Sequence, residues 1–222
     1  MQIGFIGLGN MGAPMAHNLA KAGHTVLGFD TQTLAVEMVE IVQTTRDCAE
    51  RAEVVITMLP NGKILKSVAD ETIQYMKEGS IFLDCSTVDV ASAKSVAEIA
   101  KNHKVIPLDA PVSGGIGGAK EGTLTFMVGG PDEGFMKVKE LFNIMGQKAV
   151  HCGDSGNGQS AKICNNMILG STMIATCEAF ALADKLGLDR QAMFDVVSTS
   201  SGYSWSMNAY CPAPGIGPQT PS

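Results

Sequence analysis

A lysine and an asparagine four positions apart are the first candidates for chemistry. Lys162 and Asn166 lie in the segment GNGQSAKICNNM, which carries no other charge. In a helix the two side chains share one face. Because its neighbours are uncharged, Lys162 should be partly desolvated, which lowers its pKa toward the range useful for proton transfer. A lysine that reaches solvent from a half-buried helix is the alternative, and the residues alone favour it.

A glycine-rich turn near the N-terminus is typical of a dinucleotide site. The sequence GLGNMG follows an apolar run and precedes a helical pattern. Gly7 permits the tight turn, Gly9 lets a pyrophosphate approach the backbone, and Gly12 lets helix pack on strand. The helix N-terminus adds free N–H groups. A purely structural turn is the alternative. The loop residues expected at the cofactor are Gly7, Leu8, Gly9, Asn10, Met11 and Gly12.

An acidic residue after the second apolar run indicates which dinucleotide binds. Asp30 follows Gly12 at nearly the spacing that such sites require. Its carboxylate can accept hydrogen bonds from both ribose hydroxyls of NAD, and it would repel a 2′-phosphate. The residues that follow it, 31 to 33, include no arginine to hold such a phosphate. The sequence therefore predicts NAD rather than NADP.

Three further segments end in small residues where apolar runs stop. Residues 57–60 and 85–87 follow two neighbouring runs and could line the nicotinamide side of the site. Ser86 and Thr87 could equally cap the helix expected from about Asp89. The segment DAPVSGG, from Asp109 to Gly115, leaves exposed N–H groups suited to a carboxylate. A plain connection between strands is the alternative for that segment.

The pattern of apolar runs and helical periodicity predicts the framework that positions these residues. Alternating strands and helices up to about residue 151 indicate a doubly wound, mostly parallel Rossmann-type sheet. The expected strands are 2–6, 25–29, 54–59, 81–84, 105–108, 123–128 and 149–151, with 41–44 as a weak strand. The expected helices are 11–22, 33–40, 47–51, 62–77, 89–101 and 132–145.

The C-terminal part of the sequence has a different character. A long apolar helical pattern covers 159–186, a shorter helix is expected over 190–198, and a tail rich in proline and glycine follows. We expect an NAD-binding domain over 1–155, and a long helix leading into an all-helical domain over 156–222. The second domain is short for an independent core, so we expect it to be incomplete.

Bulk properties restrict the partners. The net charge of −6 and the pI near 5.2 argue against nucleic acid and anionic membrane surfaces. The charge-free stretch 163–177 is too short for a bilayer span.

The six cysteines show neither C-x-x-C spacing nor clustering with histidine, so we expect no metal and a reducing compartment. We expect the first strand to begin at Met1 or Gln2 and to leave no room for a leader ahead of it. These features predict a soluble cytoplasmic protein, or a mitochondrial matrix protein if a presequence has been removed.

In its three motifs, GFIGLGNMG, DAPVSGG and GNGQSAKICNNM, the sequence closely resembles the β-hydroxyacid dehydrogenase family. The resemblance implies that Lys162 is the catalytic proton-transfer residue, with Asn166 beside it. It also implies that Ser113, Gly114 and Gly115 hold a substrate carboxylate. Leu59, Pro60 and Thr87 would contact the cofactor.

The residues KICNN within the third motif favour the branch of this family that oxidises 3-hydroxyisobutyrate to methylmalonate semialdehyde in valine breakdown. A small hydroxy acid bearing a carboxylate is thus the expected partner, in a homo-oligomer, either dimer or tetramer. The family continues with further helices beyond the equivalent of Ser222, so we expect a C-terminally truncated member. Alternatives are a related semialdehyde or imine reductase and a non-catalytic NAD-binding fragment. The segment between Asp30 and Ala52 is shorter than in the family, and Ile64 replaces an asparagine expected near NAD.

Overall fold

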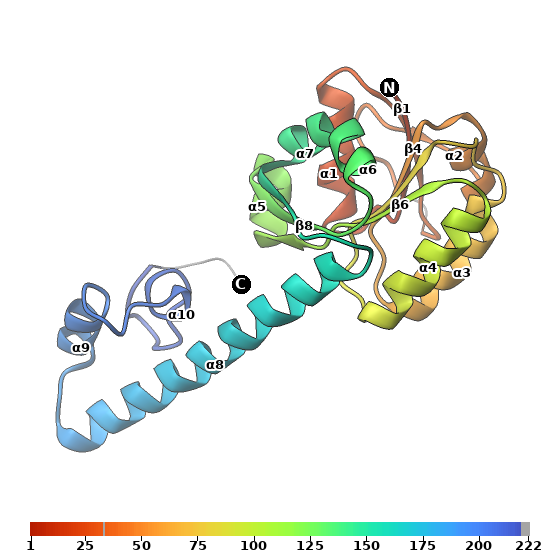
Figure 1. Ribbon diagram of the computed structural model, residues 1–222. Helices are drawn as coiled ribbons and strands as arrows, with labels where there is room; N and C mark the ends of the chain where they lie inside the picture. The colour runs from red at the N-terminus through yellow and green to blue at the C-terminus, as the bar shows by residue number, and fades with distance from the viewer. Residues whose placement is uncertain (33, 219–222) are drawn as a thin grey trace. The chain divides into compact units, whose positions relative to one another are not determined.

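A computed structural model describes residues 1–32 and 34–218 of the chain. The chain divides into two compact units, Met1–Lys162 and Ile163–Ser222 (Figure 1). The larger unit contains two β-sheets and most of the helices, and the smaller unit is helical in its described part. Each unit is described below by itself.

A six-stranded parallel sheet forms the centre of the larger unit. Its order, β3-β2-β1-β4-β5-β6, is that of a dinucleotide-binding Rossmann fold, which confirms the predicted fold class. All neighbouring pairs are parallel, so the carboxyl ends of the strands meet at one edge. The strands are β1 (Gln2–Ile6), β2 (Thr25–Phe29), β3 (Glu40–Ile41), β4 (Val54–Thr57), β5 (Ile81–Asp84) and β6 (Ile106–Asp109).

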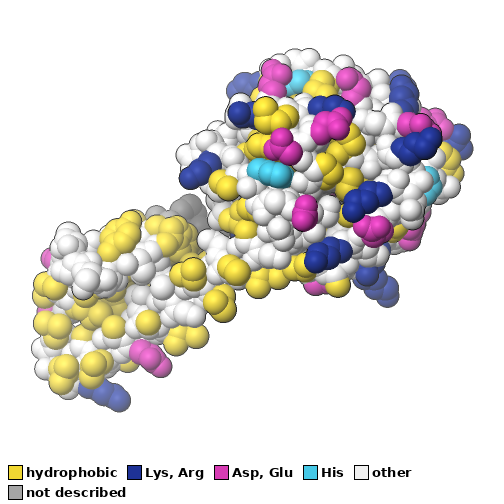
Figure 2. All heavy atoms as spheres, in the orientation of Figure 1, with side chains coloured by type: hydrophobic (Ala, Val, Ile, Leu, Met, Phe, Trp, Pro, Cys, Tyr) yellow, Lys and Arg dark blue, Asp and Glu magenta, His cyan; other side chains and the backbone are white. Residues whose placement is uncertain are grey.

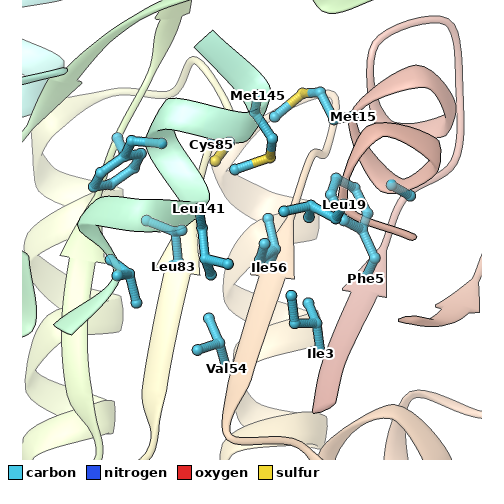
Figure 3. Packing of buried hydrophobic residues seen from close by; sticks show 14 of the residues in the cluster. Ile3, Phe5, Met15, Leu19, Val54, Ile56, Leu83, Cys85, Leu141 and Met145 are labelled. Carbon is cyan, nitrogen blue, oxygen red and sulfur yellow. The ribbon is translucent and has the colours of Figure 1, made fainter. Parts of the chain in front are cut away.

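Helices cover both faces of this sheet, because alternate apolar residues of its strands point to opposite sides. On one face, Met15 and Leu19 of α1 (Gly12–Lys21) pack with Phe5 and Ile56, beside residues of α7 (Lys139–Met145) (Figure 3). On the other face, Leu65 joins a second buried cluster. The helices that contribute to this second cluster are α2 (Thr45–Arg51), α3 (Gly62–Ile73) and α4 (Val90–Asn102).

A separate three-stranded sheet follows β6. Its order is β7-β8-β9, with β7 antiparallel and β9 parallel to β8. The predicted strands over 123–128 and 149–151 therefore exist but belong to this second sheet. The elements are β7 (Val112–Ser113), α5 (Gly115–Glu121), β8 (Leu124–Val128), α6 (Asp132–Lys137), α7 and β9 (Gly146–His151).

Three local predictions were wrong. The helix expected over 33–40 is absent from its described residues: 34–36 have no regular structure, and β3 occupies Glu40–Ile41. Thr33 itself lies outside the described residues. The helix expected over 132–145 is two helices that meet at Val138. The glycine-rich segment after Ser113 is the short helix α5 rather than an open loop.

The long helix α8 (Asn157–Leu186) begins in the larger unit and continues into the smaller one. It is followed by α9 (Arg190–Val197) and α10 (Trp205–Asn208), the second of which was not predicted. A small core joins the elements of the smaller unit. Its buried residues are Phe180, Ala183, Met193, Met207 and Ala213.

The surface of the smaller unit is strongly apolar. Hydrophobic side chains predominate on its face in Figure 2, whereas charged groups gather on the larger unit. Met167, Ile168 and Ile174 of α8 are more than half exposed. By length and composition, α8 is apolar enough to cross a membrane, a test that helices packed against protein also pass. The prediction that this part of the chain is too short to span a bilayer considered only the charge-free stretch 163–177, and α8 as a whole is longer.

Candidate active site

Two glycines of the first loop are required by close backbone contacts. Gly7 has a φ of +95°, and a Cβ there would lie 2.3 Å from the carbonyl oxygen of Met58. A Cβ on Gly12 would lie 1.8 Å from the carbonyl oxygen of Gly7. Real Cβ atoms do not approach so closely, so a side chain at either position would displace α1 from the strand ends.

Gly9 differs from these two glycines in facing open space. A Cβ on Gly9 would have no atom within 4 Å, and Gly9 and Asn10 are exposed. Among the described residues, the N–H groups of Asn10, Met11 and Gly12 have no protein acceptor. Exposed N–H groups at a helix N-terminus, beside space that no side chain fills, fit a pyrophosphate. This geometry suits NAD.

Asp30 at the end of β2 is fixed to the glycine loop. Its Oδ2 accepts a 2.7 Å hydrogen bond from the N–H of Leu8, and its Oδ1 accepts one from the N–H of Gln32 at 2.9 Å. A carboxylate has about four acceptor positions, so the half-buried group can still accept bonds from a ribose. The structure thus brings Asp30 and the loop together at one edge of the sheet.

The segments after β4 and β5 are joined by Ser86. Its Oγ accepts a 2.8 Å hydrogen bond from the N–H of Leu59. Asp89, rather than Ser86 or Thr87, caps α4 by accepting a bond from the N–H of Ser92. The capping alternative for Ser86 and Thr87 was therefore wrong. Leu59 is half-buried, and the neighbouring Pro60 and Thr87 are exposed at the same edge.

A buried carboxyl group lies beneath these segments. Oδ1 of Asp84 accepts hydrogen bonds from Thr57 Oγ1 at 2.7 Å and from the N–H of Ser86 at 3.1 Å. Its Oδ2 is buried without a partner among the described residues. Burial raises the pKa of Asp84 to about 6, and the carboxyl of Asp109 on the neighbouring strand contributes to the increase.

Asp109 fixes the beginning of α8. Its Oδ1 accepts a 2.6 Å hydrogen bond from the N–H of Gly156, and its Oδ2 accepts one from the N–H of Gln159 at 3.0 Å. Burial raises the pKa of Asp109, although these N–H groups oppose the increase. A carboxylate at the helix N-terminus satisfies donors that would otherwise have no acceptor.

Gln159 connects the same turn to the segment after β5. Its side chain is fully buried; Nε2 donates a 2.7 Å hydrogen bond to the carbonyl oxygen of Ser86, and Oε1 accepts one from the N–H of Val88 at 3.1 Å. Two side chains therefore hold the first turn of α8. Asp109 of β6 accepts hydrogen bonds from the backbone of this turn. Gln159 bonds from the turn to residues 86–88 after β5, which we call the cofactor-side segment.

The segment predicted to bind a carboxylate lies beside the same region. Ser113 ends β7 and pairs with Thr125 of β8. It is half-buried, and Gly114 and Gly115 after it are exposed and have positive φ angles of 133° and 60°. A Cβ on Gly158 would lie 2.4 Å from the carbonyl oxygen of Met127 in β8, so α8 begins directly against the sheet that carries Ser113.

Lys162 lies one turn beyond Gly158 on α8. It is half-buried, and desolvation lowers its pKa from the ordinary lysine value. Asn166 lies one further turn along the helix, is exposed, and accepts a 3.3 Å bond from Nδ2 of Asn165. No group of three metal-ligating side chains occurs within residues 1–32 and 34–218. Lys162 is thus a half-buried basic group near the start of α8, and the side chain of Lys94 also lies close to this turn, against Gly156.

Sequence reasoning assigned no role to Asp84, Asp109 or Gln159. A signal was available for the two acids, since IFLD and IPLD both end an apolar strand in aspartate. An acid at the buried carboxyl end of a parallel strand is costly without partners. Gln159 gave no comparable signal, because its partners are more than 70 positions away.

Comparisons with known proteins agree with this geometry. A family model described as the NAD-binding domain of 6-phosphogluconate dehydrogenase matches residues 2–153. A second, described as NAD-binding of NADP-dependent 3-hydroxyisobutyrate dehydrogenase, matches residues 156–217. The chain is 47% identical to 3-hydroxyisobutyrate dehydrogenase of Pseudomonas aeruginosa over 228 residues, which cover 99% of this chain and 76% of that protein. It is 43% identical to the human mitochondrial enzyme of that name, covering 99% of this chain and 68% of that protein.

Solved structures give the same result. The structure of Mycobacterium tuberculosis 3-hydroxyisobutyrate dehydrogenase with L-serine matches with a TM-score of 0.93 at 42% identity, covering 97% of this chain and 76% of that one. A Salmonella typhimurium 3-hydroxyisobutyrate dehydrogenase matches with a TM-score of 0.78 at 29% identity, covering 92% and 75%. An imine reductase from Myxococcus stipitatus, at 17% identity and a TM-score of 0.81, shares the fold.

Proposed function

The chain belongs to the 3-hydroxyisobutyrate dehydrogenase family of NAD-binding oxidoreductases, and we propose that it oxidises 3-hydroxyisobutyrate reversibly to methylmalonate semialdehyde. The observation that carries the proposal is the placement of Lys162. It is a half-buried lysine one turn from a helix start that is fixed to the edge of the NAD-binding sheet.

The cofactor is held by the loop after β1 and by the segments that follow β2, β4 and β5. The exposed N–H groups of the glycine loop bind the pyrophosphate, and Asp30 binds the adenosine ribose. The preference for NAD over NADP follows from the negative charge of Asp30. The residues proposed to contact the cofactor are Gly7, Leu8, Gly9, Asn10, Met11, Gly12, Asp30, Leu59, Pro60 and Thr87.

The substrate carboxylate is held by Ser113 and by the N–H groups of Gly114 and Gly115. A hydroxyl donor beside two exposed backbone donors gives a carboxylate charge-assisted hydrogen bonds without a bulky side chain. In a 3-hydroxy acid the hydroxyl-bearing carbon is only two bonds away from the carboxylate carbon. Binding the carboxylate therefore also fixes the carbon that is oxidised.

Lys162 accepts the hydroxyl proton on its neutral Nζ as the carbon loses its hydride. Bound NAD supplies the acceptor for that hydride. In the reverse direction the protonated Nζ returns the proton to the oxygen. A lysine can do this near neutral pH only if its pKa is lowered, which is the direction that burial gives Lys162. Asn166, on the next turn, orients the hydroxyl or the lysine.

A substrate panel tests the proposal directly. The purified chain is incubated with NAD and, in turn, with 3-hydroxyisobutyrate, L-serine, other 3-hydroxy acids and glycerate, while NADH is followed by absorbance. We expect the highest kcat/KM with 3-hydroxyisobutyrate. Preference for another compound would identify a related reductase. NAD binding without turnover of any of them would identify a non-catalytic NAD-binding protein.

We also propose the setting in which the chain works. Its net charge of −6 disfavours nucleic acid and anionic membranes, and Asn165, Asn166 and Glu178 within α8 disfavour a bilayer span. The exposed apolar residues of that helix support a homo-oligomer, either dimer or tetramer. A cytoplasmic or mitochondrial matrix location fits the cysteine spacing. Analytical ultracentrifugation with and without anionic vesicles tests the oligomer and the absence of membrane binding. A monomer would contradict the homo-oligomer, and sedimentation with the vesicles would contradict the absence of membrane binding.

A further inference from the structure

We propose that Gln159 is a positioning residue. Its hydrogen bonds to the cofactor-side segment after β5 hold the first turns of α8, and with them Lys162, in a fixed position relative to that segment. The proposal rests on the function proposed above and extends it to a fully buried residue outside the proposed substrate and cofactor contacts. Gln159 lies three positions before Lys162, within the first turns of α8. Its amide bonds to Ser86 and Val88, the residues on either side of Thr87.

Both hydrogen bonds are specific to an amide. The carbonyl oxygen of Ser86 needs a donor at 2.7 Å, and the N–H of Val88 needs an acceptor at 3.1 Å. A carboxylate would satisfy only the second, and an apolar chain neither. Because the side chain of Gln159 is fully buried, a backbone group left without its partner there costs a free energy that water cannot recover.

The backbone of the same turn has little freedom to compensate. Asp109 accepts hydrogen bonds from the N–H groups of Gly156 and Gln159, and Gly158 packs against the carbonyl oxygens of Asp109 and Met127. The turn is thus held from β6 and β8 by its backbone and from β5 by the Gln159 side chain. Loss of the side-chain contacts leaves the turn attached to β6 and β8 but uncoupled from the segment after β5.

Such uncoupling should affect catalysis more than cofactor binding. The pyrophosphate loop and Asp30 belong to β1 and β2 and make no hydrogen bond to Gln159. Lys162, by contrast, moves with the turn that carries Gln159. A displacement of about 1 Å between reacting groups lowers turnover by about 100-fold. The signature of a positioning role is therefore a loss in kcat at unchanged affinity for NAD.

Two variants and a matched control test the proposal in the full chain. Gln159→Met keeps the length of the side chain and removes both hydrogen bonds, whereas Gln159→Glu keeps only the acceptor for Val88. Ser160→Ala is the control, because among the described residues the Ser160 hydroxyl bonds only to the carbonyl oxygen of Gly156, within the same turn. We expect kcat to fall about 10- to 100-fold in both Gln159 variants and to change less than twofold in the control. The Kd for NAD should stay within about threefold of wild type in all three.

The pH profile adds a readout that general destabilisation would not move. Release of the turn exposes Lys162 to water, so its pKa should rise and the acidic limb of kcat/KM should shift to higher pH. The charged and titratable side chains packed near this turn, Asp84, Asp109 and Lys94 of α4, are kept in all three variants. An unshifted limb with wild-type kcat in Gln159→Met would overturn the proposal, as would an equal loss in Ser160→Ala.

Amide hydrogen exchange separates this inference from the proposed function. If the wild-type chain binds NAD but oxidises no hydroxy acid, the proposed function fails, and exchange at Val88 still reports on the coupling. We expect faster exchange at Val88 in Gln159→Met, with unchanged exchange at Leu8, whose N–H bonds to Asp30. Unchanged exchange at Val88 would overturn the coupling whatever the activity. If Gln159→Met does not fold, the kcat and pH profile of Gln159→Glu test the coupling, because that variant keeps the acceptor for Val88 but loses the donor to Ser86.

Discussion

The N–H of Leu8 donates a 2.7 Å hydrogen bond to Oδ2 of Asp30, which ties the loop after β1 to the end of β2. The acid proposed to bind the ribose is therefore also bonded to the loop proposed to bind the pyrophosphate. Its two oxygens each accept a backbone N–H, so the carboxylate is oriented in the structure without a ligand. This double attachment makes Asp30 the natural place to test cofactor choice.

Asp30→Asn should weaken NAD and relax the preference against NADP. The variant keeps an acceptor for Leu8 but loses the charge that strengthens hydrogen bonds to ribose hydroxyls, so the Kd for NAD should rise about tenfold. The affinity for NADP should stay constant or improve, since the repulsion of a 2′-phosphate disappears. Titration calorimetry with both cofactors measures this, with the exposed Asp70→Asn as control. An unchanged ratio of the two Kd values would contradict the role of Asp30.

Gly9 and Gly12 should respond to alanine in opposite ways. A Cβ on Gly9 meets no protein atom, so Gly9→Ala should fold with wild-type stability and lose NAD affinity by an order of magnitude or more, because the methyl group occupies the pyrophosphate space. A Cβ on Gly12 lies 1.8 Å from the carbonyl oxygen of Gly7, so Gly12→Ala should lower stability itself. Thermal unfolding and NAD titration of both variants check this. Wild-type NAD affinity in Gly9→Ala would place the pyrophosphate elsewhere.

Asp84 should make the protein less stable as the pH rises. Its pKa of about 6 in the fold lies above the ordinary 3.8, so the folded state retains a proton that the unfolded state has lost between these values. Stability therefore falls as pH rises through this window, by about 3 kcal/mol at most. Asp84→Asn lacks this titration, so its stability relative to wild type should increase between pH 4 and pH 7. Urea unfolding followed by far-UV circular dichroism measures the difference.

Asp89 supplies a control of opposite sign. Hydrogen bonds from Ser92 lower the pKa of Asp89 in the fold, so its contribution is present above the unfolded pKa and is lost as the pH falls through the folded one. Asp89→Asn should be less stable than wild type at pH 7, and the gap should close in acid. Parallel pH trends for the two variants would contradict the assignment of buried and capping roles.

The sequence contains the signals for most of the Rossmann sheet because those signals are local. Apolar runs over 2–6, 25–29 and 81–84 match strands of the structure residue for residue. The spacing of the strands and the glycine turn then predict where the cofactor binds, since the carboxyl ends of parallel strands meet at one edge of the sheet. The cofactor side of the candidate site could be assembled in this way before any contact was known.

Two errors show where local pattern loses to tertiary structure. The segment LAVEMV carries helical periodicity, but Met38 takes a φ of +64°, and Glu40 pairs with Leu27 to extend the sheet. The glycine-rich run after Ser113 has poor helix propensity, yet it forms α5, with Gly118 and Ala119 buried. In the first case packing with distant residues outweighs a local preference for helix, and in the second it outweighs a local preference against helix.

The hydrogen-bond network around the lysine could not be predicted for a related reason. Asp109 and Gly156 are 47 positions apart, and Gln159 and Ser86 are 73 apart. Neither periodicity nor residue type indicates such a pairing within one sequence. The lysine itself was identified through family resemblance, because the residues alone favoured a solvent-facing side chain.

Replacement of Lys162 by alanine is the most direct test of its role as the proton-transfer residue. We expect Lys162→Ala to bind NAD with wild-type affinity and to lose at least about 1,000-fold in kcat with 3-hydroxyisobutyrate, since it removes the proton acceptor. Lys139→Ala, which removes an exposed lysine of α7, should keep wild-type turnover. Near-normal turnover by Lys162→Ala, with NAD still bound, would show that another group accepts the proton.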